Sequence, residues 1–152
     1  MSPLAARWFK VAFGAIAALL ALAAISVFFG AVALPGAASS CANSPLFELL
    51  SPNGEFKAVA FSRDCGATTS FSTQVSLLGP NDVLPKEGGN LFAADTNHNS
   101  APSGPGGGPV VRLAWAGPSV LRVERHPLAR VFLSRPSLNG VQVEYAASKT
   151  DG

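Results

Sequence analysis

The chain has 152 residues, the size of one domain; 48% of them are hydrophobic and 13% charged, about half the charged share usual in a soluble domain. Basic and acidic residues balance after residue 38, so the formal net charge of +2 comes from Arg7 and Lys10. This distribution excludes a strongly basic nucleic-acid-binding protein and an acidic disordered tail.

The first predicted element is an uncharged apolar segment, residues 11–34. As a helix it would be roughly 36 Å long, enough to cross a hydrocarbon core of about 30 Å, and it is apolar on every face. No basic residue follows it until Lys57, so the positive-inside rule predicts a cytoplasmic N-terminus. We therefore expect a signal or single transmembrane segment, 1–38, and an extracytoplasmic domain, 39–152, at the cell membrane.

Three fates of the apolar segment remain open. Its length exceeds the roughly 7–15 apolar residues of a signal peptide, which favours a retained membrane anchor. Pro35-Gly36 ends the helix and the small residues up to Ala38 permit cleavage there, which would leave a secreted or periplasmic domain. Ala38-Ser39-Ser40-Cys41 resembles a bacterial lipobox, with Ala38 where a larger aliphatic residue is usual, and would lipidate Cys41.

Cys41 and Cys65 are the two cysteines, an even number in a chain predicted to enter an oxidising compartment. A disulfide between them would close a loop of about 25 residues and contribute on the order of 3–4 kcal/mol to stability. Lipidation of Cys41 would leave Cys65 as an unpaired thiol. The sequence therefore favours a disulfide.

Beyond the cysteines, the turn residues and hydrophobic alternation are typical of a β protein. Ser51-Pro52-Asn53-Gly54 and Asn139-Gly140 are turn sequences, and residues 71–77 alternate between apolar and polar. The prediction is mainly β: a small antiparallel β-sheet domain of about seven short strands. We expect strands at residues 46–50, 56–62, 71–77, 110–115, 120–125, 130–138 and 141–145, with 91–94 as a short strand or plug.

The last of these hairpins allows its register to be predicted. A two-residue loop pairs Leu138 with Val141, and a continuous strand would then place Arg135 opposite Glu144 as a cross-strand ion pair. Pro136 cannot donate to a ladder, so its strand is expected at a sheet edge or bulged there.

Five arginines lie between residues 112 and 135 with only Glu124 to offset them. A three-residue connection in the preceding hairpin would place Arg112 opposite Arg122, which requires an anion between them. That anion would be Glu124, a lipid headgroup or a carboxylate of another envelope protein. The alternative is that these arginines are solvated on outward faces.

The Gly- and Pro-rich stretch 99–109 has no large side chains to bury, and we expect it to be a flexible loop. It is not a phosphate-binding loop, because neither Lys-Ser nor Lys-Thr follows Gly108.

Asp95, Asn97 and Asn99 are spaced like the first three ligands of a calcium-binding loop. Ser100 replaces the turn glycine and Gly106 the bidentate glutamate, so a polar loop with Asx turns is favoured over a divalent-ion module. No cofactor is expected.

Cys65, with His98 or His126 and with Asp64 or Asp95, is the candidate nucleophile of a thiol hydrolase. The competing interpretation is the disulfide, and we favour it because exported cysteines are usually bridged.

The segments Ser51–Gly54, Lys57–Val59 and Arg63–Ser76, with Arg63-Asp64-Cys65-Gly66-Ala67-Thr68-Thr69 the most specific part, resemble a family of small exported bacterial proteins of unknown function. Gly89–Phe92 and Asn139–Val141 resemble its later blocks. The resemblance covers roughly residues 41 to 145 and implies an envelope location and a Cys-containing β domain. It implies no catalytic residue.

The connection Asp64–Thr69 is expected to be a tight turn whose amides are capped by the hydroxyls of Thr68 and Thr69. A small-ligand or peptide site there, with Arg63 and Asp64 as a polar pair, is the functional alternative. On these grounds we expect a non-enzymatic binding or structural module of the cell envelope.

Overall fold

The computed structural model describes residues 41–66 and 69–148. These residues contain nine strands and no helix. The mainly β prediction is confirmed, although the strands exceed the seven expected. The predicted membrane span 11–34 lies outside these residues, and nothing within them is a helix long and apolar enough to cross a membrane. The strands are β1 (Ala42–Leu50), β2 (Lys57–Asp64), β3 (Ser72–Leu78), β4 (Phe92–Asp95), β5 (Val111–Gly117), β6 (Val120–Arg125), β7 (Arg130–Ser134), β8 (Ser137–Leu138) and β9 (Val141–Ala147).

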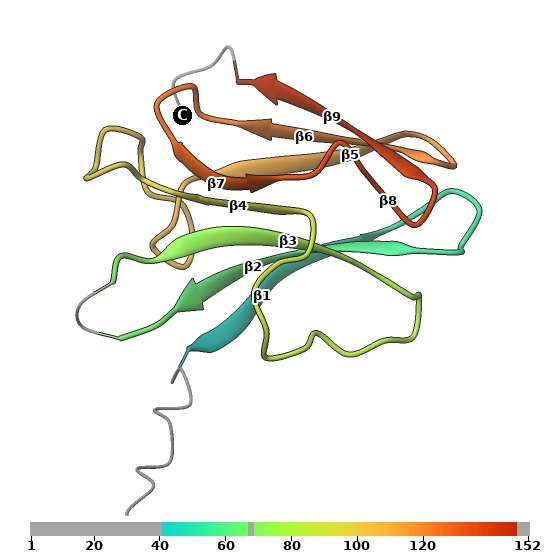
Figure 1. Cartoon of the computed structure of the whole chain (residues 1–152), viewed down its shortest axis with the longest axis horizontal. Coiled ribbons are helices and arrows are strands. Elements are labelled where there is room, and N and C mark those ends of the chain that lie inside the picture. The colour runs from blue at the N-terminus through green and yellow to red at the C-terminus, as the bar shows by residue number, and fades with distance from the viewer. Residues whose placement is uncertain (1–40, 67–68, 149–152) are drawn as a thin grey trace, which may run out of the picture. The chain divides into compact units, whose positions relative to one another are not determined.

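The strands form two sheets that pack face to face. Sheet A has the order β1-β2-β3-β4-β7 and is antiparallel throughout, and sheet B has the order β5-β6-β9-β8. Figure 1 shows β1, β2 and β3 in one layer and β5, β6 and β9 in the other. The expectation of a purely antiparallel domain is wrong in one place, because β6 and β9 pair in parallel.

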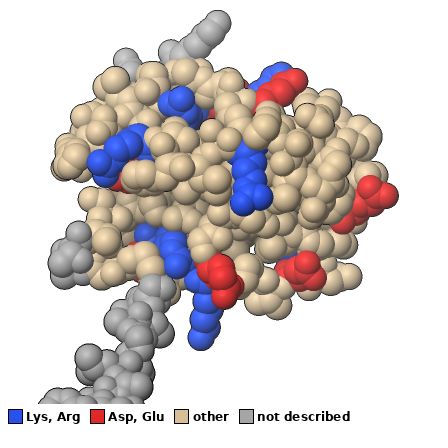
Figure 2. All heavy atoms as spheres, in the orientation of Figure 1, with Lys and Arg blue, Asp and Glu red and all other residues tan. Residues whose placement is uncertain are grey.

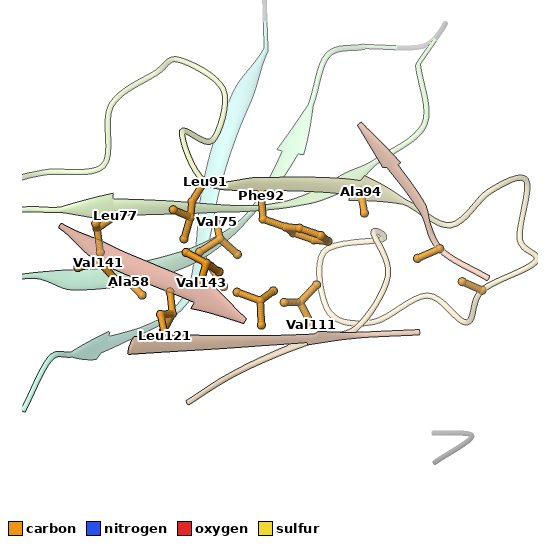
Figure 3. Packing of buried hydrophobic residues seen from close by; sticks show 14 residues of the cluster. Ala58, Val75, Leu77, Leu91, Phe92, Ala94, Val111, Leu121, Val141 and Val143 are labelled. Carbon is orange, nitrogen blue, oxygen red and sulfur yellow. The ribbon is translucent and has the colours of Figure 1, made fainter. Parts of the chain in front are cut away.

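The hydrophobic core lies between the sheets. Alternate residues of sheet A such as Val75 and Phe92 point toward Leu121 and Val143 of sheet B (Figure 3). Phe92 and Leu121 are fully buried. Removing such side chains from water supplies most of the favourable free energy of a sandwich of this size.

The outer face of sheet A is also covered. Val59 and Phe61 on β2 point away from the core, yet are only 3% and 0% exposed. The connection 79–91 is bonded to this side of the sheet, since Gln74 Oε1 accepts a hydrogen bond from Gly89 N at 2.6 Å. Asn90 binds the backbone of Leu77 through both polar atoms of its amide. These bonds hold the connection against sheet A, whose β2 is therefore buried on both faces.

The Gly- and Pro-rich stretch packs against β2 and β3. Pro109 O accepts a hydrogen bond from Thr73 Oγ1 at 2.7 Å, and Gly106 O accepts one from the hydroxyl of Ser62. Gly108 and Pro109 are buried. The expectation that this run buries nothing is wrong, because the absence of side chains lets its backbone approach β3 closely.

The predicted strand 130–138 is divided between the two sheets. Pro136 interrupts it, so β7 pairs in sheet A while β8 pairs with β9 at the edge of sheet B. Leu138 lies opposite Val141 as predicted. The predicted Arg135–Glu144 pair is wrong, since the backbone N–H of Arg135 donates to Leu91 O at 3.0 Å, outside any strand.

Tyr145 on β9 fixes this crossover. Its hydroxyl shares its one hydrogen between Arg135 O at 2.8 Å and Leu91 O at 3.1 Å, and its ring stacks on Phe92 at 5.9 Å between centroids. Burial raises the pKa of the phenol to about 12.

A methyl group at position 108 tests the packing of the Gly-rich stretch. A Cβ on Gly108 would lie 2.5 Å from both Thr73 N and Thr73 Oγ1, so Gly108→Ala is expected to lower the free energy of unfolding by about 1–3 kcal/mol. The control is Gly117→Ala, where a Cβ meets nothing within 4 Å. Urea denaturation measures both variants. Equal midpoints would show that the stretch does not pack on β3.

Titration of Tyr145, the one tyrosine of the sequence, tests the crossover. Absorbance at 295 nm should titrate at about pH 12 in the folded protein and at about pH 10 in denaturant. Because folding raises this pKa, the stability linked to the phenol is fully present below about pH 10 and is lost as the pH rises through the folded value. Tyr145→Phe should abolish the absorbance change and destabilise the fold by about 1 kcal/mol. A midpoint near 10 without denaturant would contradict the buried environment.

Candidate functional site

The Cys41–Cys65 disulfide joins the beginning of β1 to the residue after β2, and it confirms the predicted pairing. Ala42 and Asp64 lie opposite each other in the adjacent rung of the antiparallel pair. The bridge therefore closes the open end of the β1–β2 hairpin, which would otherwise fray. The residues around this end form the candidate site.

Arg63 and Asp64 are consecutive on β2 and therefore point to opposite faces of sheet A. The guanidinium of Arg63 donates through Nη1 to Asn43 Oδ1 and Lys86 O, both at 2.7 Å, and so ties the connection 79–91 to the strands. Arg63 thus has a structural role. The two residues do not form the polar pair considered above.

Asp64 faces an open hollow of about 370 Å³ at the disulfide end of sheet A. Its Oδ1 accepts a hydrogen bond from Gly66 N at 2.9 Å, which fixes the direction of the carboxylate. The other lining residues are uncharged: Ala42, Ser44, Ser62, Phe71, Gly106 and Gly107.

A second, more apolar hollow of about 230 Å³ lies farther along β1. Leu46, Phe47 and Val110 contribute to its lining. Gly106 lies beside both hollows, since a Cβ there would come within 3.2 Å of Leu46 Cδ2 and 2.6 Å of Ser62 Cβ. The inner side of β1 thus carries two neighbouring hollows bounded by the Gly-rich stretch.

The turn after β2 differs in detail from the expectation. The hydroxyl of Thr69 donates to Gly66 O at 3.2 Å instead of capping an amide, and Thr69 N donates to the same oxygen. Thr68, the other proposed capping residue, lies outside the described residues.

Asp95, the one carboxylate of the calcium-like sequence, is paired with Arg130. Nε of Arg130 donates to Oδ1 at 3.2 Å, and Nη2 makes a shorter bond to Oδ2. Asp95 Oδ1 also accepts the Asn97 N–H at 2.8 Å, which is the expected Asx turn. Asn97 and Asn99 have positive φ angles of 50° and 66°. No group of three or more acidic, His or Cys residues that could hold a metal occurs in the described part of the chain.

The pKa of Asp95 reflects this environment. Burial, the largest single influence, disfavours the charged form, but the hydrogen bonds from Arg130 and Asn97 and the charges of Arg130 and His98 outweigh it. The net result is a pKa below the usual value of 3.8. Asp95 therefore stays ionised as the buried half of an ion pair.

Cys65 has no thiol in this structure, because its sulfur is bonded to Cys41. A thiolate is the nucleophile in cysteine-dependent hydrolysis, and the bridged form cannot supply one. The geometry thus gives the hydrolase alternative no support.

Arg112 and Arg122 lie on the outer face of sheet B but not opposite each other. A bulge near Gly117 shifts the hairpin, so Arg112 lies opposite Glu124 and Arg122 opposite Ala114. Arg122 bonds to Glu144 Oε2 at 3.0 Å from the parallel neighbour β9. The predicted Arg112–Arg122 juxtaposition is wrong, and both arginines lie beside carboxylates. Figure 2 likewise shows basic and acidic side chains interspersed on one face of the protein.

Several residues around the first hollow were not identified from sequence. Phe71 belongs to the predicted strand 71–77, yet it precedes β3 and is 45% exposed. Ala42 and Ser44 lie before the strand predicted at 46–50, and Gly106-Gly107 belongs to the predicted flexible loop 99–109. The adjacent glycines are the one feature of the sequence that points to this part of the site. Both have φ near +80°, a backbone conformation that other residues rarely adopt.

Comparisons of the chain with protein-family models, curated proteins and solved structures find no match.

The Asp95–Arg130 pair gives a pH-dependent prediction. Its stabilisation is fully present above about pH 4 and is lost as the pH falls through the lowered folded-state pKa of Asp95. Asp95→Asn should therefore destabilise the fold at pH 6, on the order of 1 kcal/mol, and the difference from the parent should shrink toward pH 2. Urea denaturation at the two pH values measures it. Glu144→Gln, which alters the exposed pair on sheet B, is the control and should have little effect at either pH. A difference that does not depend on pH would contradict an ionised Asp95.

Proposed function

We propose that this protein is an exported or membrane-anchored component of a bacterial-type cell envelope. In this proposal its disulfide-bonded β-sandwich is a non-enzymatic binding or structural module outside the cytoplasm. The observation that carries the proposal is the Cys41–Cys65 bridge, because structural disulfides form and persist in oxidising compartments. The apolar segment 11–34, with basic residues only on its N-terminal side, supports the same location.

The position of the bridge favours two of the three fates of the apolar segment. Only residues 35–40 separate that segment from Cys41, so the bridge stands where the chain would leave a membrane. Lipidation of Cys41 would use the sulfur that Cys65 occupies. A retained anchor and a cleaved signal are both compatible with the bridge, and the length of the segment favours the anchor.

Binding is favoured over catalysis because the residues considered for chemistry have structural partners. Cys65, the candidate nucleophile, is bridged, and Asp95, the carboxylate of the calcium-like sequence, is paired with Arg130. The hollows along β1 are open to solvent and bordered by exposed Phe47 and Phe71, which are 40% and 45% exposed. Exposed aromatic side chains beside a concave surface are typical of contact sites.

The test is the intact mass of the full chain purified from membranes without reductant. A retained leader, no lipid, and the loss of two hydrogen atoms relative to the reduced sequence are expected, with no labelling of either cysteine by iodoacetamide. Protein found in the cytosol with both thiols alkylated would overturn the proposal. Rapid labelling of Cys65 with a lipid on Cys41 would overturn it as well and would favour the hydrolase alternative.

Removal of the bridge gives a stability prediction. The Cys41→Ser, Cys65→Ser double variant should unfold with a free energy about 2–4 kcal/mol lower than the parent, because its unfolded chain is no longer restricted by the closed loop. Chemical denaturation with and without reductant measures the difference. Reductant should lower the parent midpoint and leave that of the variant unchanged; equal midpoints in both conditions would show that the bridge does not stabilise the fold.

A further inference from the structure

We propose that the hollow beside the disulfide binds a cationic side chain, lysine or arginine, of a polypeptide partner. The inference rests on the proposed function, since it names what the binding module would recognise. Three features of the site support it: the charge of Asp64, the exposed ring of Phe71, and the bonds that hold these groups in place.

The charge in this hollow is that of Asp64 alone, because the other lining residues are uncharged. Arg63, the adjacent cation in sequence, is directed to Asn43 and Lys86 O. Lys57, Arg122 and Arg130 are paired with Glu48, Glu144 and Asp95, and Asp64 has no ion-pair partner within residues 41–66 and 69–148. A cation from another molecule would complement this carboxylate.

Phe71 supplies an apolar surface beside that charge. Its ring is exposed and lies next to Gly107, where a Cβ would come within 2.8 Å of ring atoms. A side chain at position 107 would therefore displace the ring or cover it. Lysine and arginine combine an aliphatic stem, which packs on such a ring, with a head group attracted by its π face and by a carboxylate.

A disulfide and two hydrogen bonds hold the groups of this site in place. The bridge fixes the ends of β1 and β2, and Gly66 N orients the carboxylate of Asp64. The Ser62 hydroxyl holds the Gly-rich stretch, which also lines the hollow, through Gly106 O. Preorganised groups lose little conformational entropy on binding, which allows a small site to retain affinity.

The size and openness of the hollow favour a side chain of a polypeptide over a larger free ligand. Its volume of about 370 Å³ lies at the lower end of the range of ligand pockets. Ala42 and Ser44 on one side belong to β1, the edge strand of sheet A. The remainder of a partner can therefore stay outside the hollow while one long side chain enters it.

The test is an NMR titration of the full chain in detergent micelles with two peptides, acetyl-Gly-Arg-Gly-amide and its citrulline analogue, which is uncharged but of the same shape. The arginine peptide should cause saturable shifts of the Gly66, Phe71 and Gly107 amides. The citrulline peptide should bind about fivefold or more weakly, the factor that corresponds to about 1 kcal/mol for a partly exposed ion pair.

Two matched variants distinguish a specific site from general charge attraction. Asp64→Asn keeps an acceptor for Gly66 N. It should weaken binding of the arginine peptide about as much as replacing the arginine of that peptide by citrulline does. Asp82→Asn is the control, because Asp82 likewise accepts a glycine N–H, that of Gly79 at 2.9 Å, but does not line this hollow. It should leave the titration unchanged.

Equal shifts with both peptides, insensitivity to Asp64→Asn, or no saturable shift of the hollow's amides would overturn the inference. The proposed function has a separate readout in the membrane-purified mass and thiol state. A chain with the bridge and the retained leader but no response to arginine would refute the cationic site and leave the envelope module standing.

Discussion

The covalent bond between Cys41 and Cys65 is the constraint on which the candidate site depends most directly. It joins the beginning of the first strand to the end of the second, at the end of sheet A where the β1–β2 hairpin has no turn to close it. Strand ends with few packing partners open most readily in β proteins. The bridge holds this end together, and with it Asp64, which lies in the rung next to the disulfide.

Burial on both faces of sheet A determines where a partner can make contact. Sheet B covers the inner face and the connection 79–91 covers much of the outer face, so that Phe61 and Phe92 are fully buried on opposite sides. The Gly-rich stretch then fills part of the space between the sheets near β1. Concave surface is left on both sides of β1. The two neighbouring hollows lie on its inner side, and a hollow of about 500 Å³ lies on its outer side, between β1, β2 and residues 81–84.

The distribution of charge supports this assignment. Several basic side chains are paired with carboxylates in the structure: Arg122 with Glu144, Arg130 with Asp95, and Lys57 with Glu48. Pairs on exposed faces contribute little free energy, but they neutralise the surface locally. Asp64 differs from these groups because the pleat of β2 directs its neighbour Arg63 to the other face.

The sequence by itself determined the features that depend on neighbouring residues: the mainly β class, the turn at Asn139-Gly140 with Leu138 opposite Val141, and a pair of cysteines suited to a bridge. Local turn chemistry and the two-residue period of a strand are sufficient for these. The tertiary structure alone decided that 130–138 divides between two sheets, that β6 and β9 run parallel, and that the Gly-rich stretch forms a wall of the candidate site. These features depend on contacts between distant segments, such as Arg135 N with Leu91 O and Ser62 Oγ with Gly106 O. Such contacts are set by how the sheets pack and leave no periodic signal in the residues that make them.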